Sequence, residues 1–168
     1  MSEPLNAQRR RFFGLAAMTI AAAEFGLARL ASAQSSPSAK AAVTHAAFTA
    51  LKQVKAGVLD IGYAEAGPAD GPVVLLVHGW PYDIHTYVDV APILADAGYR
   101  VIVPYLRGYG TTRFLSDKTP RNGQQSVLAA DMIALMDALG IEKAIVGGCD
   151  WGARTVNIMA ALWPERCV

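Results

Sequence analysis

The chain has 168 residues with 15 basic and 14 acidic side chains, which gives a formal net charge of +1. Residues 1–33 contain four of the basic and two of the acidic groups, so the rest of the chain carries 11 basic and 12 acidic groups and a charge of −1. That remainder has no basic stripe, which argues against nucleic acid and anionic membrane surfaces as partners. The two cysteines, Cys149 and Cys167, form neither a zinc pattern nor a disulfide framework, and we expect no metal and no cofactor.

Residues 1–33 have the features of an export signal. The pair Arg9-Arg10 stands two residues before a phenylalanine, an apolar run covers residues 14–23, and an Ala-Ser-Ala cleavage site ends at Ala33. The pattern resembles a signal for the twin-arginine export machinery. An uncleaved membrane anchor is the alternative, but the apolar run is too short to span a bilayer. We therefore predict cleavage after Ala33 and a periplasmic or secreted product.

The folded domain is expected to cover residues 48–168. Residues 34–47 are rich in serine and alanine and predict a flexible lead-in. Two runs with alternating apolar residues, 48–54 and 57–64, predict a hairpin at a sheet edge. After a turn rich in glycine and proline, residues 73–77 are apolar without alternation, which is typical of a parallel strand buried on both faces.

Helical and strand patterns alternate along the rest of the chain. The expected elements are a helix at 92–97, a strand at 100–104, a helix at 124–139, a strand at 144–147 and a helix at 153–163. This alternation predicts an α/β domain with a doubly wound, mostly parallel sheet. In such a sheet the functional residues gather at the carboxyl ends of the strands.

The best candidate site is the tight turn within residues 144–152, where a strand ends in glycines and a helix follows. Centred on Asp150, with Gly148 and Gly152 on either side, the turn fits the pattern G-x-nucleophile-x-G. The glycines allow two backbones to pass where a Cβ would block them. A helix N-cap is the alternative role for Asp150. Cys149 is the weaker candidate nucleophile, because the same pattern centred there needs glycine at a position that tryptophan occupies.

Unusual residues also follow two other predicted strands. The tetrapeptide His-Gly-Trp-Pro (78–81) follows the first parallel strand, and Arg-Gly-Tyr-Gly (107–110) comes shortly after the next one. Together with the Asp150 turn, they resemble the α/β-hydrolase superfamily, specifically its Asp-nucleophile branch of epoxide hydrolases and haloalkane dehalogenases. The resemblance runs from about residue 48 to the end of the chain. It implies an α/β-hydrolase fold.

The resemblance also implies a role for each residue of these motifs. Asp150 is the implied nucleophile, which attacks the carbon of an epoxide or alkyl halide and forms an alkyl-enzyme ester. The backbone N–H groups of Trp80 and Trp151 are the implied oxyanion hole for hydrolysis of that ester. His78 is expected to orient its loop rather than to act as the base. The residues implied to support these loops are His78, Gly79, Pro81, Arg107, Gly148 and Gly152.

The residue at position 80 separates the two activities of this branch. Haloalkane dehalogenases commonly have asparagine there as a halide ligand, whereas epoxide hydrolases commonly have an aromatic residue, so Trp80 favours epoxide opening. The implied substrate is therefore a small molecule, first an epoxide and alternatively an alkyl halide, which halide release would reveal. A third hypothesis, from a different class, is a short non-catalytic binding or subunit protein. In that case an Asp150→Asn variant would behave like the parent.

The family pattern continues past the position that residue 168 occupies. It includes further core strands, a helical cap with tyrosines that protonate the opening epoxide, an acid and the catalytic histidine. His45, His78 and His85 do not stand where the family places that histidine. We therefore expect an α/β-hydrolase fold truncated after the helix that follows the Asp150 turn, in which the ester forms but hydrolysis stalls. The strand at 144–147 would be an exposed apolar edge, and the sequence predicts no oligomeric state.

Overall fold

The computed structural model describes residue 48 and residues 50–168. The signal predicted at 1–33 and the lead-in predicted at 34–47 lie outside these residues. Among the helices of the described part, none has the length and apolar character needed to cross a bilayer. The elements in chain order, with η for short 3-10 helices, are β1 (Lys52–Ala56), β2 (Leu59–Ala66), β3 (Val73–Val77), η2 (Ile84–Tyr87), α2 (Val90–Asp96), β4 (Arg100–Pro104), β5 (Arg113–Phe114), α3 (Gln125–Ala138), β6 (Ile145–Gly148), α4 (Trp151–Leu162) and η3 (Pro164–Arg166).

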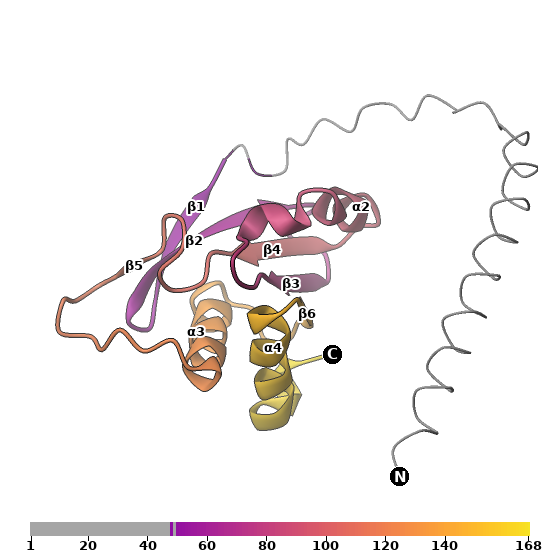
Figure 1. Ribbon diagram of the computed structural model, residues 1–168. Helices are drawn as coiled ribbons and strands as arrows, with labels where there is room; N and C mark the ends of the chain where they lie inside the picture. Colours follow the sequence, from indigo (N-terminus) through magenta and orange to yellow (C-terminus); the bar gives the residue numbers. More distant parts are fainter. Residues whose placement is uncertain (1–47, 49) are drawn as a thin grey trace, which may run out of the picture. The chain divides into compact units, whose positions relative to one another are not determined.

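A mixed sheet with the strand order β1-β2-β4-β3-β6 forms the centre of the described unit (Figure 1). β1 and β2 form the predicted antiparallel hairpin, and β2 also pairs antiparallel with β4 and with the short β5. β4, β3 and β6 run parallel to one another. The predicted doubly wound α/β architecture is confirmed, and its parallel part is the half that carries all three candidate loops.

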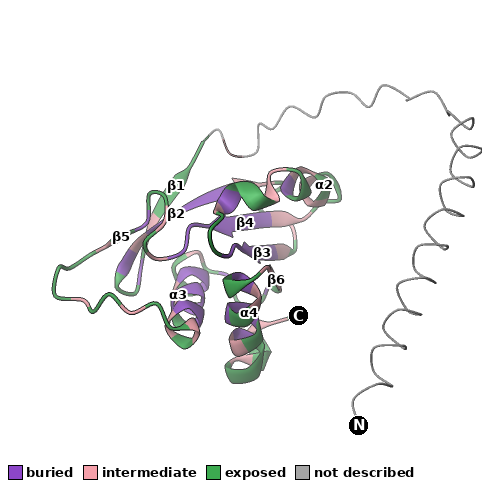
Figure 2. Ribbon diagram, in the orientation of Figure 1, coloured by how far each residue is buried: buried purple, intermediate pink, exposed green. Residues whose placement is uncertain are grey.

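Each face of the sheet has its own hydrophobic core. α3 and α4 cover one face, and α2 with η2 covers the other (Figure 1). The side chains of β3 alternate between the two cores: Leu75 and Val77 face α3 and α4, whereas Val74 and Leu76 face α2. Figure 2 shows β3 and β4 as largely buried strands between these layers. Burial on both faces explains why β3 is apolar at every position.

The observed elements differ from the predicted ones mainly at their ends. β3 and β4 have the predicted bounds, and α3 is one residue shorter at each end. α2 begins at Val90, so Pro92 is its third residue and not its first. Proline is tolerated there because the amides of the first helical turn have no partner within the helix. α4 begins at Trp151, directly after Asp150 and two residues before the predicted start.

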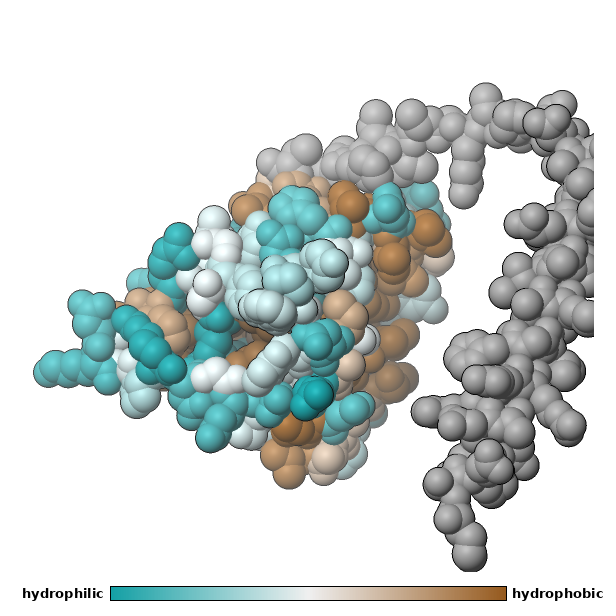
Figure 3. Space-filling model, in the orientation of Figure 1, coloured by the Kyte–Doolittle hydropathy of each residue, from teal (hydrophilic) through white to brown (hydrophobic). Residues whose placement is uncertain are grey.

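β6 is the last strand in the sheet order of the described residues. The chain beside it carries one bridge on the outer side, between Ala144 and Cys167. Ile145 is 37% exposed, and Leu162 and Val168 are more exposed still. Figure 3 shows hydrophobic residues gathered on this side of the unit. The expected apolar edge is therefore present in the part of the chain that the structure describes.

Candidate active site

The turn between β6 and α4 presents Asp150 on a backbone that few side chains adopt. Asp150 has φ 52° and ψ −116°, and it is the one non-glycine residue with positive φ among the described residues. The flanking glycines allow the close backbone approach that was predicted. A Cβ on Gly148 would overlap the backbone of Gly152, and a Cβ on Gly152 would overlap the Val77 carbonyl at the end of β3. The turn is thus wedged against the neighbouring strand.

The Asp150 carboxylate accepts a hydrogen bond from Trp80, one of the two predicted oxyanion-hole donors. The Trp80 N–H donates to Oδ1 at 2.9 Å. The N–H groups of Trp80 and, next, of Trp151 lower the pKa of this carboxyl, so Asp150 is ionised at neutral pH. Asp150 occupies the N-cap position of α4, but its side chain makes no capping hydrogen bond. Its side chain is bonded instead to a loop 70 residues away in the sequence.

Gly79 allows the loop after β3 to reach Asp150. A Cβ at this position would lie 2.6 Å from the Asp150 Cβ and 2.6 Å from the Cys149 carbonyl oxygen. Both distances are shorter than real Cβ contacts, so any larger residue would push the Trp80 N–H away from the carboxylate. The peptide bond from Trp80 to Pro81 is cis.

His78 is fully buried between the loops that follow β3 and β4. Its Nε2 accepts a hydrogen bond from the Leu106 N–H at 3.1 Å, so the ring proton is on Nδ1, which lies 3.1 Å from the Gly79 carbonyl oxygen. Burial lowers the pKa of the His78 imidazole, and the ring is therefore neutral at pH 7. Both ring nitrogens are therefore engaged: Nε2 joins the loop after β3 to the loop after β4, and Nδ1 bonds within its own loop.

Arg107 anchors the loop after β4 to α3. Its Nε and Nη2 donate to the two carboxylate oxygens of Asp131, each at 2.6 Å, and its Nη1 donates to the Asn122 carbonyl at 2.8 Å. The side chains of Arg107 and Asp131 are each 7% exposed. Burial raises the pKa of the Asp131 carboxyl, and the Arg107 guanidinium opposes that rise. A bidentate pair of this kind fixes the direction of both side chains.

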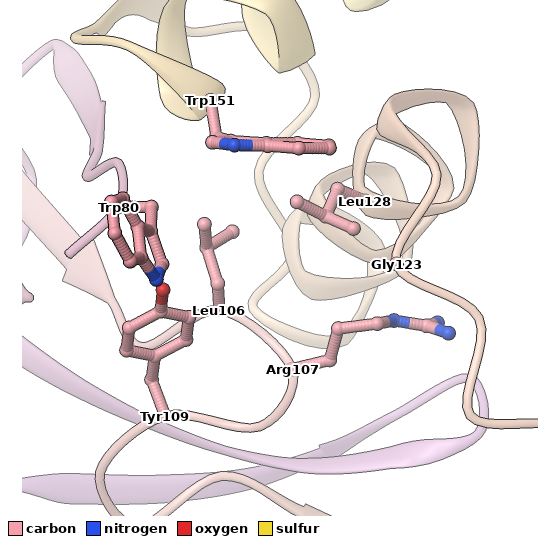
Figure 4. A pocket seen from close by; sticks show the side chains of 7 residues that line it. All are labelled: Trp80, Leu106, Arg107, Tyr109, Gly123, Leu128 and Trp151. Carbon is pink, nitrogen blue, oxygen red and sulfur yellow. The ribbon is translucent and has the colours of Figure 1, made fainter.

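A cavity of about 380 Å³ lies beside the Asp150 turn. Figure 4 shows the Trp151 ring over one end of it, near Leu128, while the Trp80 and Tyr109 side chains stand together at another. The wall is mainly apolar, which suits a small apolar substrate. The lining residues are Trp80, Leu106, Arg107, Tyr109, Gly123, Leu128 and Trp151.

The structure brings the residues of the three predicted motifs to one end of the parallel strands. It also shows that Asp131, a residue that was not predicted, is the partner of Arg107. Asp131 follows Leu128 by three residues and precedes Leu135 by four, so helical periodicity places it on the apolar face of α3. A carboxylate on such a face needs a buried partner, and this signal was available in the sequence.

In the described part of the chain, neither a histidine base nor a cluster of metal ligands lies at the Asp150 turn. Of the two histidines in this part, His78 is engaged as above and His85 binds Asp83 at 2.9 Å; neither hydrogen-bonds to Asp150. Within residues 48 and 50–168, no group of three His, Cys, Asp or Glu side chains is placed to hold a metal ion.

Residues 72–167 match the family model described as the alpha/beta hydrolase fold. This chain belongs to the α/β-hydrolase family. A Klebsiella pneumoniae protein of known structure, provisionally named an epoxide hydrolase, is 63% identical over 74% of this chain and 41% of its own, with a TM-score of 0.72. Epoxide hydrolase A from Mycobacterium thermoresistibile is 35% identical over 70% of this chain and 36% of its own, with a TM-score of 0.65.

The curated relatives point to the same branch of the family. Epoxide hydrolase B from Mycobacterium tuberculosis is 39% identical to this α/β hydrolase over 98 residues, which are 58% of this chain and 27% of the relative. The resemblance to epoxide hydrolases, inferred from three short motifs, is confirmed. This chain spans between about a quarter and two fifths of the length of these relatives.

Proposed function

We propose that this α/β hydrolase opens epoxides, with Asp150 as the nucleophile. The observation that carries the proposal is the hydrogen bond from the Trp80 N–H to the Asp150 carboxylate, on a turn with positive φ beside an apolar cavity. A carboxylate is already deprotonated at neutral pH, so it can attack saturated carbon without a base. The relatives that carry the name epoxide hydrolase support this choice of substrate.

The proposed first step forms an ester between the chain and the substrate. A carboxylate oxygen of Asp150 bonds to an epoxide carbon, the carbon–oxygen bond of the ring breaks, and the ring oxygen takes up a proton. The ester carbonyl keeps the N–H groups of Trp80 and Trp151 as donors, ready for the oxyanion of hydrolysis. Since neither described histidine hydrogen-bonds to Asp150, we expect the ester of the 168-residue chain to persist.

Displacement of halide from an alkyl halide is the second candidate. The indole rings of Trp80 and Trp151 both line the cavity, and an indole N–H can donate a hydrogen bond to a halide ion. The two candidates share the nucleophile and the ester, and they differ in the leaving group. Release of bromide from an alkyl bromide, with no adduct from an epoxide, would favour this second activity.

The ester is detectable by intact mass. We expect the purified chain to gain the mass of one styrene oxide, and hydroxylamine to remove it, because hydroxylamine cleaves esters but not thioethers on cysteine. An Asp150→Asn variant should lose the hydroxylamine-labile adduct completely. Asp70→Asn, in the exposed turn before β3, is the matched control and should keep it. An adduct that survives in Asp150→Asn, or a parent chain that never forms one, would contradict the proposal.

We infer separately that residues 1–33 direct export through the twin-arginine machinery. The support is the Arg9-Arg10 pair, the short apolar run after it and the Ala-Ser-Ala site. In fractionated bacteria the parent chain should reach the periplasm with Gln34 as its first residue. The double variant Arg9→Lys/Arg10→Lys should remain in the cytoplasm as the precursor, whereas Arg29→Lys should be exported. Equal export of all three chains would contradict the inference.

A further inference from the structure

The cavity beside Asp150 has one side-chain hydroxyl on its wall, that of Tyr109. The other strongly polar lining side chain, Arg107, already donates to Asp131 and to the Asn122 carbonyl. Within the described residues the Tyr109 hydroxyl makes no hydrogen bond, and its side chain is half-buried. Figure 4 shows this hydroxyl at the end of the ring that lies toward Trp80. The hydroxyl is therefore available to a bound molecule.

The Tyr109 ring is held in place by its surroundings. Gly108 and Gly110 have φ of +84° and +48°, so the chain turns sharply on both sides of Tyr109. The Tyr109 N–H closes this turn by donating to the Leu106 carbonyl at 3.0 Å. The ring packs edge-on against the His78 imidazole, with the centroids 4.7 Å apart. Because His78 is fixed by its own two contacts, the position of the hydroxyl is set before any substrate binds.

The negative charge of Asp150 also acts on the Tyr109 hydroxyl. Burial first and the Asp150 charge second raise the pKa of the Tyr109 hydroxyl. The hydroxyl is therefore a proton donor at neutral pH and not a phenolate. Tyr109 comes from the loop after β4 and lines the same cavity as Trp80 and Trp151. Asp150 lies directly beside these two tryptophans, because Trp151 follows it in the chain and the Trp80 N–H donates to its carboxylate.

We propose that Tyr109 is a catalytic residue of epoxide opening and donates its hydroxyl proton to the epoxide oxygen, an inference that rests on the proposed function of Asp150. As the Asp150 oxygen bonds to carbon, the ring carbon–oxygen bond breaks and its electron pair goes to the leaving oxygen. That oxygen takes the Tyr109 proton and becomes a hydroxyl, and water returns a proton to the tyrosinate. The core domain thus carries an acid of its own, in addition to any tyrosines that a cap supplies.

The test compares two leaving groups in the 168-residue chain. Styrene oxide needs a proton on its leaving oxygen, whereas benzyl bromide releases bromide without one. For Tyr109→Phe we expect the hydroxylamine-labile adduct from styrene oxide to form at least about tenfold more slowly, since a positioned acid contributes this much or more. The adduct from benzyl bromide should form at the rate of the parent. Tyr82→Phe, an exposed tyrosine outside the cavity lining, is the matched control and should leave both rates unchanged.

Each other outcome overturns a defined part of this inference. Equal slowing with both reagents would mean that Tyr109 only maintains the shape of the site. Unchanged rates with both reagents would remove Tyr109 from the reaction while Asp150 remains its nucleophile. A parent chain that forms no ester with either reagent would overturn the proposed function and this inference with it.

Discussion

A Gly152→Ala variant is expected to lose the folded state, with a destabilisation of more than about 3 kcal/mol. The new methyl group would overlap the Val77 carbonyl oxygen, and it would lie 2.6 Å from the Val77 carbonyl carbon and 2.7 Å from the His78 carbonyl oxygen. All three atoms belong to backbone. β3 is hydrogen-bonded to strands on both sides, so its backbone has no direction in which to move.

Denaturant unfolding followed by circular dichroism measures this loss. Gly123→Ala is the matched control, because nothing lies within 4 Å of a Cβ there and its φ is not in the left-handed region. That variant should differ from the parent by less than about 0.5 kcal/mol. If Gly152→Ala unfolded at the same denaturant concentration as Gly123→Ala, the wedged contact between the Asp150 turn and β3 would not exist as described.

An Arg107→Leu variant is expected to destabilise the fold by about 3–5 kcal/mol. The substitution leaves the Asp131 carboxylate buried on α3 without the guanidinium that now donates to both of its oxygens. The double variant Arg107→Leu/Asp131→Leu removes the unpaired charge. We therefore expect it to be more stable than the single variant.

The same unfolding experiment contains its own control. Lys52→Met removes a cation from Glu65, but Lys52 is 56% exposed and Glu65 keeps Arg100 as a partner at 2.6 Å. Exposed pairs contribute about 0–1 kcal/mol, so this variant should unfold close to the parent. If the double variant were no more stable than Arg107→Leu alone, the loss of stability would come from packing and not from the unpaired Asp131 carboxylate.

The sequence predicted the parallel part of the fold well because burial on two faces leaves a clear pattern. Val73–Val77 and, after its first residue, Arg100–Pro104 are apolar runs whose side chains enter both cores, and the predicted bounds of both strands were correct. β5 was missed because it has two residues and exists only through its pairing with Leu59 and Asp60 in β2. Such a strand is specified by its partner and not by its own side chains.

The site was predictable to the extent that it follows from sheet topology. Three motifs at the carboxyl ends of β3, β4 and β6 had to meet, because these strands are parallel neighbours. The contacts among the motifs were not predictable from the residues alone. That the Trp80 N–H reaches Asp150, that His78 receives the Leu106 N–H and that Tyr109 faces the cavity all depend on loop conformations set by contacts across the fold.

The backbone conformation of Asp150 lowers the stability of the fold in the same turn that presents the proposed nucleophile. Holding a residue other than glycine at φ 52° and ψ −116° costs about 1–3 kcal/mol of folding free energy, whereas glycine adopts positive φ without this cost. Glycine at position 150 would therefore relieve this cost, but it would also remove the carboxylate that we propose as the nucleophile.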